Sequence, residues 1–251
     1  MKSASINDMS APGVYTQSLR VKNRDVDMHR RVRASRLFEW LQEASIAHTE
    51  RLGMGREKTL DRGLLWVVTL QRSEIERMPE YDEDIRVESW PGETMHLLFP
   101  RYYRVLTAEG EELVRGSALW MLVDGETRRF VFPEKHGIVI PGTETGYELP
   151  LPAAPAALET TETAEFTVPY SYVDLNGHMN NTRYFDLAED MIGAAAAGRR
   201  LRAAETEFKA EIRHGETVSL RWGWEGGRCY FEGSTARPAF SMLLSYDAKN
   251  A

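Results

Sequence analysis

The residues best suited to chemistry lie in one short polar segment, DLNGHMNN at 174–181. Asp174, Asn176 and His178 stand at every second position, which in an extended loop puts all three side chains on one side. An imidazole moves protons near neutral pH, and an amide can orient water or stabilise an oxyanion. A carboxylate can orient the imidazole, act as a base or attack directly. Because the same residue types also form ordinary turns, a polar turn without chemistry is the alternative interpretation.

An internal repeat favours a site at this segment. With an offset of 147 residues, VKNRDVDMHRRVRASRLFEWLQE at 21–43 aligns with VPYSYVDLNGHMNNTRYFDLAED at 168–190, and five of the 23 positions are identical. Duplication of one folding unit explains this match better than chance. The first copy keeps the aspartate as Asp27, but has His29 and Arg31 where the second copy has an amide and an imidazole. We therefore expect a single active site, centred on the second copy.

Helices and strands predicted around the two copies give an α+β fold. An apolar stripe predicts one helix from Ser35, its expected N-cap, to about Arg51, with Gly53 as its stop, and a second helix is expected over 181–197. Strand-like runs are expected at 14–21, 64–76, 84–91, 97–106, 112–123, 165–168, 206–213, 217–225, 228–236 and 239–246.

A proline-rich segment divides the chain. Residues 141–160 hold four of the 11 prolines and show no periodic pattern, which indicates a linker. The predicted units are 14–140 and 161–251, each with one helix against a curved antiparallel sheet.

Composition excludes several classes of function. The net charge is 31 − 38 = −7, which argues against nucleic-acid binding and gives no attraction to anionic membranes. A single cysteine, Cys229, excludes an internal disulfide, and neither a metal-binding nor a nucleotide-binding motif occurs, so we expect no metal and no cofactor. No segment has signal-peptide or membrane-spanning character, which predicts a cytoplasmic protein.

Two motifs carry a resemblance to a known family. VDLNGHMNN resembles the signature loop of hotdog-fold thioesterases. LLWVV followed by IERMPEYDEDIRVESWPG resembles the N-terminal signature of the acyl-acyl-carrier-protein (acyl-ACP) thioesterases, with Met78-Pro79 and Tyr81 in the turn. The resemblance covers residues 14–246 and implies two tandem hotdog units.

The resemblance also implies which residues act. The family's catalytic Asp, Asn and His match the 174–178 residues named above, and its later Glu matches Glu211 in the segment EFKAE. Plant members have a cysteine directly after this Glu. Here Ile212 stands in that place, which excludes a cysteine nucleophile. The implied reaction releases a free fatty acid from fatty acyl-ACP, by attack of Asp174 or of a water activated by Glu211 or His178.

The implied partner is acyl-carrier protein, and the acyl chain is expected between helix residues 37–47 and strand residues 64–70 of the N-terminal unit. Because the carrier is acidic, docking needs a local basic patch; the candidates are Arg30, Arg31, Arg33 and Arg36, or Arg199, Arg200 and Arg202. Two other functions stay open: an acyl-CoA thioesterase of the same fold, and a non-catalytic acyl-binding module. The chain is expected to act as a monomer or homodimer.

Overall fold

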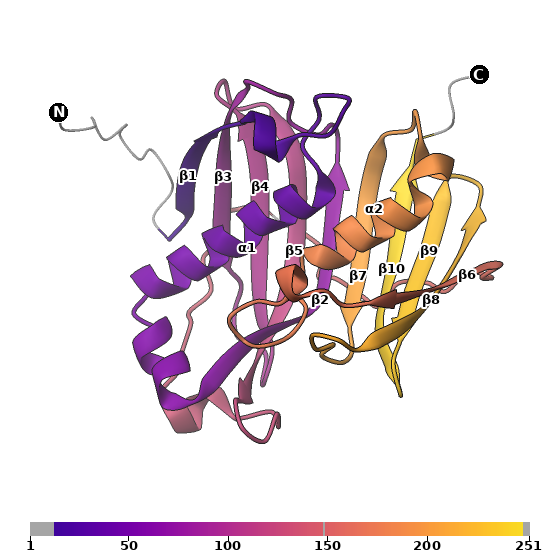
Figure 1. Cartoon of the computed structure of the whole chain (residues 1–251). Helices are drawn as coiled ribbons and strands as arrows, with labels where there is room; N and C mark the ends of the chain where they lie inside the picture. The colour runs from indigo at the N-terminus through magenta and orange to yellow at the C-terminus, as the bar shows by residue number, and fades with distance from the viewer. Residues whose placement is uncertain (1–12, 148, 248–251) are drawn as a thin grey trace.

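The computed structural model describes residues 13–147 and 149–247. Within them, one antiparallel ten-stranded sheet runs in the order β1-β3-β4-β5-β2-β7-β10-β9-β8-β6. Helices α1 (Ala34–Arg51) and α2 (Arg183–Ala196) lie on the same face of this sheet (Figure 1). The strands are β1 (Tyr15–Arg20), β2 (Leu64–Ile75), β3 (Asp84–Pro91), β4 (Phe99–Thr107), β5 (Glu112–Asp124), β6 (Glu162–Thr167), β7 (Leu201–Phe208), β8 (Thr217–Glu225), β9 (Arg228–Ser234) and β10 (Pro238–Tyr246).

The predicted α+β class is confirmed, and the two units share the sheet edge to edge. β2 pairs with β7 from Leu70 opposite Glu207 to Glu74 opposite Ala203. Each unit contributes one helix and its own strands, so α1 covers the N-terminal half and α2 the C-terminal half (Figure 1). No strand or α-helix is described between β5 and β6, where the linker was predicted. The domain limits themselves stay a prediction.

Two sequence-based expectations were wrong at the level of single elements. The N-cap of α1 is Arg33, and Ser35 lies buried inside the helix. The strand predicted at 206–213 is β7, which ends at Phe208 because Lys209 N and Ala210 N both donate to Ala239 O, at 2.8 and 3.0 Å. Two consecutive amides on one carbonyl bend the chain away from β10, so Glu211 lies beyond the strand.

The two helices meet through an aromatic pair. Phe38 of α1 stacks on Phe185 of α2 with ring centroids 3.9 Å apart and an interplanar angle of 9°. Both rings are fully buried, and they occupy matching positions of the internal repeat. This contact joins the two halves on the helical side as the β2–β7 pairing joins them in the sheet.

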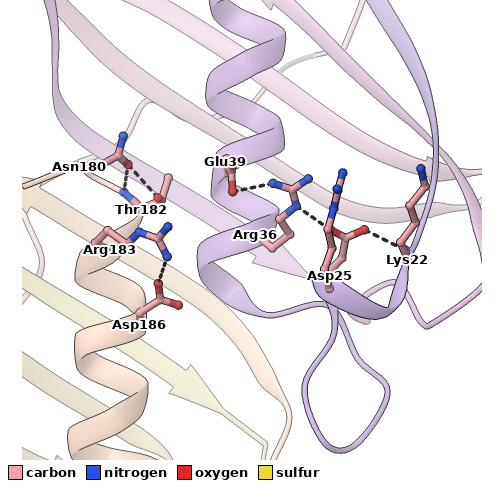
Figure 2. A network of polar contacts seen from close by, with 9 residues as sticks. Lys22, Asp25, Arg36, Glu39, Asn180, Thr182, Arg183 and Asp186 are labelled. Atoms are coloured by element: carbon pink, nitrogen blue, oxygen red, sulfur yellow. Dashed lines mark hydrogen bonds and ion pairs between the residues drawn. The ribbon is translucent and has the colours of Figure 1, made fainter. Parts of the chain in front are cut away.

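A polar network fixes the start of α1. Arg36 Nε donates to Asp25 at 2.8 Å, and its Nη1 lies 2.7 Å from Glu39 (Figure 2). Asp25 is almost fully buried and also accepts from Lys22 N. The helix start is thereby tied to the loop that precedes it. Neither helix has the length and apolar character that crossing a bilayer requires, within the described residues.

Candidate active site

The polar segment at 174–181 forms a tight turn, not the extended loop that was expected. Asp174 N donates to His178 O at 3.1 Å, and Gly177 N donates back to Asp174 O at 3.0 Å. The Asp174 carboxylate closes the turn further by accepting Asn176 N at 2.8 Å. Gly177 has φ +83°, a conformation that costs glycine little. The candidate side chains converge because the chain reverses, not because positions alternate along a strand.

The loop of the first repeat has the same hydrogen bonds. Asp27 N donates to Arg31 O at 2.7 Å, Arg30 N donates to Asp27 O at 3.0 Å, and Asp27 Oδ1 accepts His29 N at 2.8 Å. Arg30 has φ +66° at the position that Gly177 takes in the second copy. The duplication is therefore structural as well as sequential. It also shows that an aspartate at this position shapes the loop even where the amide and imidazole are missing.

His178 and Glu211 are brought together by backbone pairing. His178 forms an antiparallel bridge with Arg213, and Met179 N donates to Ile212 O at 2.7 Å. His178 Nε2 then lies 3.3 Å from Glu211 Oε1. This nitrogen is buried and makes no aligned hydrogen bond with any described residue. A buried ring nitrogen without such a partner is a candidate for contact with a substrate.

Arg128 completes the cluster, although no motif of the sequence pointed to it. Its Nη1 lies 3.2 Å from the same Glu211 oxygen, so the carboxylate sits between a guanidinium and an imidazole. Arg128 belongs to the turn after β5 and has φ +56°. Asp124 holds that turn: its Oδ1 accepts Thr127 N at 2.7 Å, and its carbonyl accepts Arg128 N at 2.9 Å. The N-terminal unit therefore supplies a residue to a site built on the C-terminal unit.

Asn180 joins the loop to α2. Its Oδ1 accepts Thr182 N and Thr182 Oγ1 at 2.9 and 2.8 Å (Figure 2), and its Nδ2 lies 3.4 Å from Asp174 Oδ2. The N-cap of α2 is Thr182, so the helix begins two residues after the expected start at 181. Asn181 lines the cavity described next.

A cavity of about 970 Å³ lies beside this cluster. All four predicted catalytic residues line it, as do Arg128 and Tyr184. The rest of its wall comes mostly from the N-terminal unit, including residues of both segments expected to hold an acyl chain: Gln42, Ser45, Ile46, Thr49, Leu64, Trp66, Val68, Phe99, Arg101 and Trp120. The cavity thus runs from the candidate site across the helix-facing side of the N-terminal strands.

Other candidates from the sequence lie elsewhere. Cys229 is buried, and burial raises the pKa of its thiol to about 12, so it is inert at neutral pH. None of the arginines in the two predicted basic patches lines the cavity. Several of them are engaged: Arg36 pairs with Asp25 and Glu39, and Arg31 Nη1 donates to Arg199 O at 3.2 Å. The basic side chains that line the cavity are Arg56, Arg101, Arg128, Lys209, Arg213 and Arg237.

Comparison with known proteins identifies the family. Residues 12–134 match the acyl-ACP thioesterase N-terminal domain, and residues 156–233 match the C-terminal domain of the same family. The chain belongs to the acyl-ACP thioesterase family. The family membership predicted from VDLNGHMNN and the N-terminal signature is confirmed.

Relatives and solved structures agree. The chain is 21% identical over 214 residues to the palmitoyl-acyl carrier protein thioesterase of Arabidopsis thaliana, covering 79% of this chain and 52% of that protein. It is 25% identical over 193 residues to a dodecanoyl-ACP hydrolase of Umbellularia californica, covering 68% and 49%. The chain spans at most about half the length of these curated relatives.

The fold extends over nearly the whole chain. An acyl-ACP thioesterase from Bacteroides thetaiotaomicron superposes with a TM-score of 0.79 at 22% identity, covering 94% of this chain and 98% of that one. The 12:0-ACP thioesterase from Umbellularia californica superposes with a TM-score of 0.80 at 18% identity, covering 95% and 98%. The tandem arrangement expected from the internal repeat is therefore that of this family.

Proposed function

We propose that this protein hydrolyses fatty acyl thioesters of acyl-carrier protein in the cytoplasm and releases the free fatty acid. The observation that carries the proposal is the contact between His178 Nε2 and Glu211 Oε1, 3.3 Å apart on the wall of a large, partly apolar cavity. An acid–base pair beside a long apolar chamber suits a thioester with an acyl tail. The family of the chain supports the same substrate class.

The proposed chemistry uses water as the nucleophile. Glu211 takes one proton from a water molecule while the water oxygen forms a bond to the thioester carbonyl carbon, and His178, 3.3 Å from Glu211, relays that proton. The tetrahedral intermediate then collapses, the carbon–sulfur bond breaks, and the proton passes to the leaving sulfur. Asn176 orients the water or stabilises the oxyanion, and Arg128 holds the Glu211 carboxylate in place at 3.2 Å.

Asp174 acts in this scheme by shaping the loop. Its two carboxylate oxygens lie near Asn176 N and Asn180 Nδ2, at 2.8 and 3.4 Å, and Asp27 makes the equivalent backbone contact in the first repeat, which lacks the Asn–His pair. A residue that serves the same loop in both copies needs no role as nucleophile to explain its presence.

The Asp174→Asn variant separates the two schemes. Because an amide oxygen can still accept Asn176 N, we expect kcat to fall by no more than about 10-fold, a loss of roughly one neutral hydrogen bond's contribution. In Asp174→Ala, which removes the acceptor, kcat should fall further and the melting temperature should also fall. The measurement is steady-state release of fatty acid from acyl-ACP. If Asp174→Asn loses all turnover while its melting temperature stays unchanged, Asp174 is the nucleophile.

We place the docking site for the acidic carrier at the cavity's basic rim. Arg213 and Arg237 are exposed and line the cavity, and among the described residues no carboxylate lies within 4.0 Å of either guanidinium, although Arg213 N donates to Glu216 Oε2 at 2.6 Å. Surface arginines without internal partners are free to meet acidic side chains of a carrier. The tandem repeat supplies both hotdog units from one chain, so the proposal needs no second copy.

Charge reversal tests this docking surface. Arg237→Glu should raise KM for acyl-ACP by about 3- to 10-fold at low salt, with kcat unchanged, because rim charges act mainly on association. The effect should shrink at high ionic strength. The matched control is Arg200→Glu, because Arg200 is an exposed arginine from one of the two patches predicted from the sequence and does not line the cavity. Equal effects of the two variants would contradict docking at the rim.

The experiment that tests the proposed function is fatty-acid release from a panel of acyl-ACPs of different chain length, run beside the matching acyl-CoAs. We expect higher kcat/KM with acyl-ACP. A preference for acyl-CoA would favour the coenzyme A thioesterase. Binding of acyl-ACP without turnover would favour a non-catalytic acyl-binding module.

A further inference from the structure

A charged side chain lies in the wall of the cavity where an alkyl chain would need none. Arg101 of β4 is only 4% exposed, yet it lines the cavity. Its Nη1 lies 2.9 Å from His48 Nδ1, and its Nη2 donates to Thr49 Oγ1 at 2.8 Å. Among the described residues no carboxylate lies within 4.0 Å of this guanidinium, although 18 arginine–carboxylate pairs of that kind occur elsewhere in them. Arg101 is therefore held by neutral groups alone.

The charge of Arg101 persists at neutral pH. Burial lowers its pKa to about 10, which still leaves the guanidinium protonated. His48 does not share the charge, because burial and the neighbouring guanidinium lower the pKa of its imidazole to about 4. A neutral His48 can accept the hydrogen bond from Arg101. The result is one buried cation without a counter-charge, and burying an uncompensated charge is unfavourable unless a ligand compensates it.

A donor without a partner lies on the same wall as this uncompensated charge. Trp66 Nε1 is buried and has no hydrogen-bond acceptor among the described residues. The Trp66 ring packs edge-on against Phe99, with centroids 4.8 Å apart. Phe99 and Arg101 are two residues apart on β4 and so project to the same face of the sheet. An indole N–H and a guanidinium therefore flank one apolar ring, and both groups can only donate.

These donors lie on the N-terminal side of the cavity, away from the candidate catalytic residues. β4 is separated from β7 by β5 and β2 in the sheet. Three strand spacings amount to roughly 14 Å. Glu211 follows β7, whereas Arg101 sits on β4. A group bound at Arg101 therefore belongs to the distal part of an acyl chain whose thioester is at His178.

We propose that the distal part of the cavity binds an oxygen atom carried by the acyl chain, a hydroxyl, an oxo group or a terminal carboxylate, through Arg101 and Trp66. An unsubstituted alkyl chain would leave the charge of Arg101 uncompensated and the Trp66 N–H without an acceptor. An oxygen-bearing group supplies partial or full negative charge to Arg101 and an acceptor to Trp66 Nε1. The inference rests on the proposed function and deepens it, because it names oxygenated acyl chains as the preferred substrates.

The test compares kcat/KM for pairs of acyl-ACPs of equal length, one unsubstituted and one with a distal hydroxyl, oxo or terminal carboxylate group. For the wild-type protein we expect the best oxygenated substrate to exceed its unsubstituted partner by about 10- to 100-fold. Arg101→Met should bring this ratio close to one, and Arg101→Lys should keep part of the preference for the carboxylate. Trp66→Phe, which retains the ring, should lower the ratio by a smaller factor.

Several results would overturn the inference. A wild-type protein that hydrolyses every unsubstituted chain as fast as its oxygenated partners has no acceptor site, and this outcome needs no variant. If Arg101→Met slows all substrates by the same factor, Arg101 only ties α1 to the sheet. If no acyl-ACP is hydrolysed at all, the proposed function fails. Calorimetric binding of the free acids then decides: about 10-fold tighter binding of oxygenated acids supports the site, and equal affinities refute it.

Discussion

Glu211→Gln should lower kcat for acyl-ACP hydrolysis by about 10²- to 10⁴-fold, the usual contribution of a positioned general base. Glutamine keeps the size of the side chain but loses the negative charge and most of the proton affinity. The affected atom is Oε1, which lies 3.3 Å from His178 Nε2 and 3.2 Å from Arg128 Nη1. Because the proposed site for the acyl chain lies elsewhere in the cavity, KM should change far less than kcat.

Glu207→Gln is the matched control for this prediction. Glu207 lies four residues earlier on β7, pairs with Lys209 at 3.1 Å and does not line the cavity. Its removal should leave kcat within about 2-fold, as expected for a partly exposed ion pair. Rates from both variants are compared after circular dichroism shows that each is folded. A Glu211→Gln enzyme with wild-type kcat would exclude this carboxylate from the chemistry.

Phe38→Ala should destabilise the whole protein, by about 3–5 kcal/mol, as for a fully buried aromatic ring replaced by a methyl group. Phe38 stacks on Phe185 at the junction of α1 and α2, so the cavity left behind opens between the two units. Urea unfolding measures the loss as a shift of the midpoint.

Phe132→Ala controls for the loss of an aromatic ring as such. Phe132 is 59% exposed, so its replacement should change the free energy of unfolding by no more than about 0.5 kcal/mol. If Phe38→Ala lowers the free energy of unfolding by no more than Phe132→Ala does, the helix–helix contact does not hold the two halves together. Separate unfolding transitions for the halves of the wild-type protein would lead to the same conclusion.

The internal repeat is the reason that much of the fold and site could be predicted from the sequence. Asp27 and Asp174 mark two loops with the same hydrogen bonds, and the residues that differ between the loops, above all His178, are those at the cavity. The alternation at 174–178 pointed to three residues that all line the cavity, but the extended loop from which this followed is not what the structure has. They converge through a turn closed by Asp174 and Gly177, which a pattern of polar residues does not distinguish from an extended loop.

The remaining parts of the site depend on long-range contacts. Arg128 reaches Glu211 only because the turn after β5 lies beside the end of β7 across the shared sheet. Arg101 becomes informative only once its burial and its neutral partners are known, since RYYRV reads as an ordinary strand. Glu211 was predicted to lie on a strand, but it lies beyond the end of β7. The sequence could not show this, because the bend depends on hydrogen bonds to Ala239 O, which is distant along the chain.

The most direct test of the account is fatty-acid release from acyl-ACP by wild type, His178→Ala and Arg31→Ala. Arg31 occupies in the first repeat the position that His178 occupies in the second, so the two substitutions change equivalent points of two similar loops. We predict chain-length-dependent release by the wild type, a loss of about 10²-fold or more in His178→Ala, and retained turnover in Arg31→Ala. Release that survives in His178→Ala, or that fails equally in both variants, would contradict a single active site built on the second repeat.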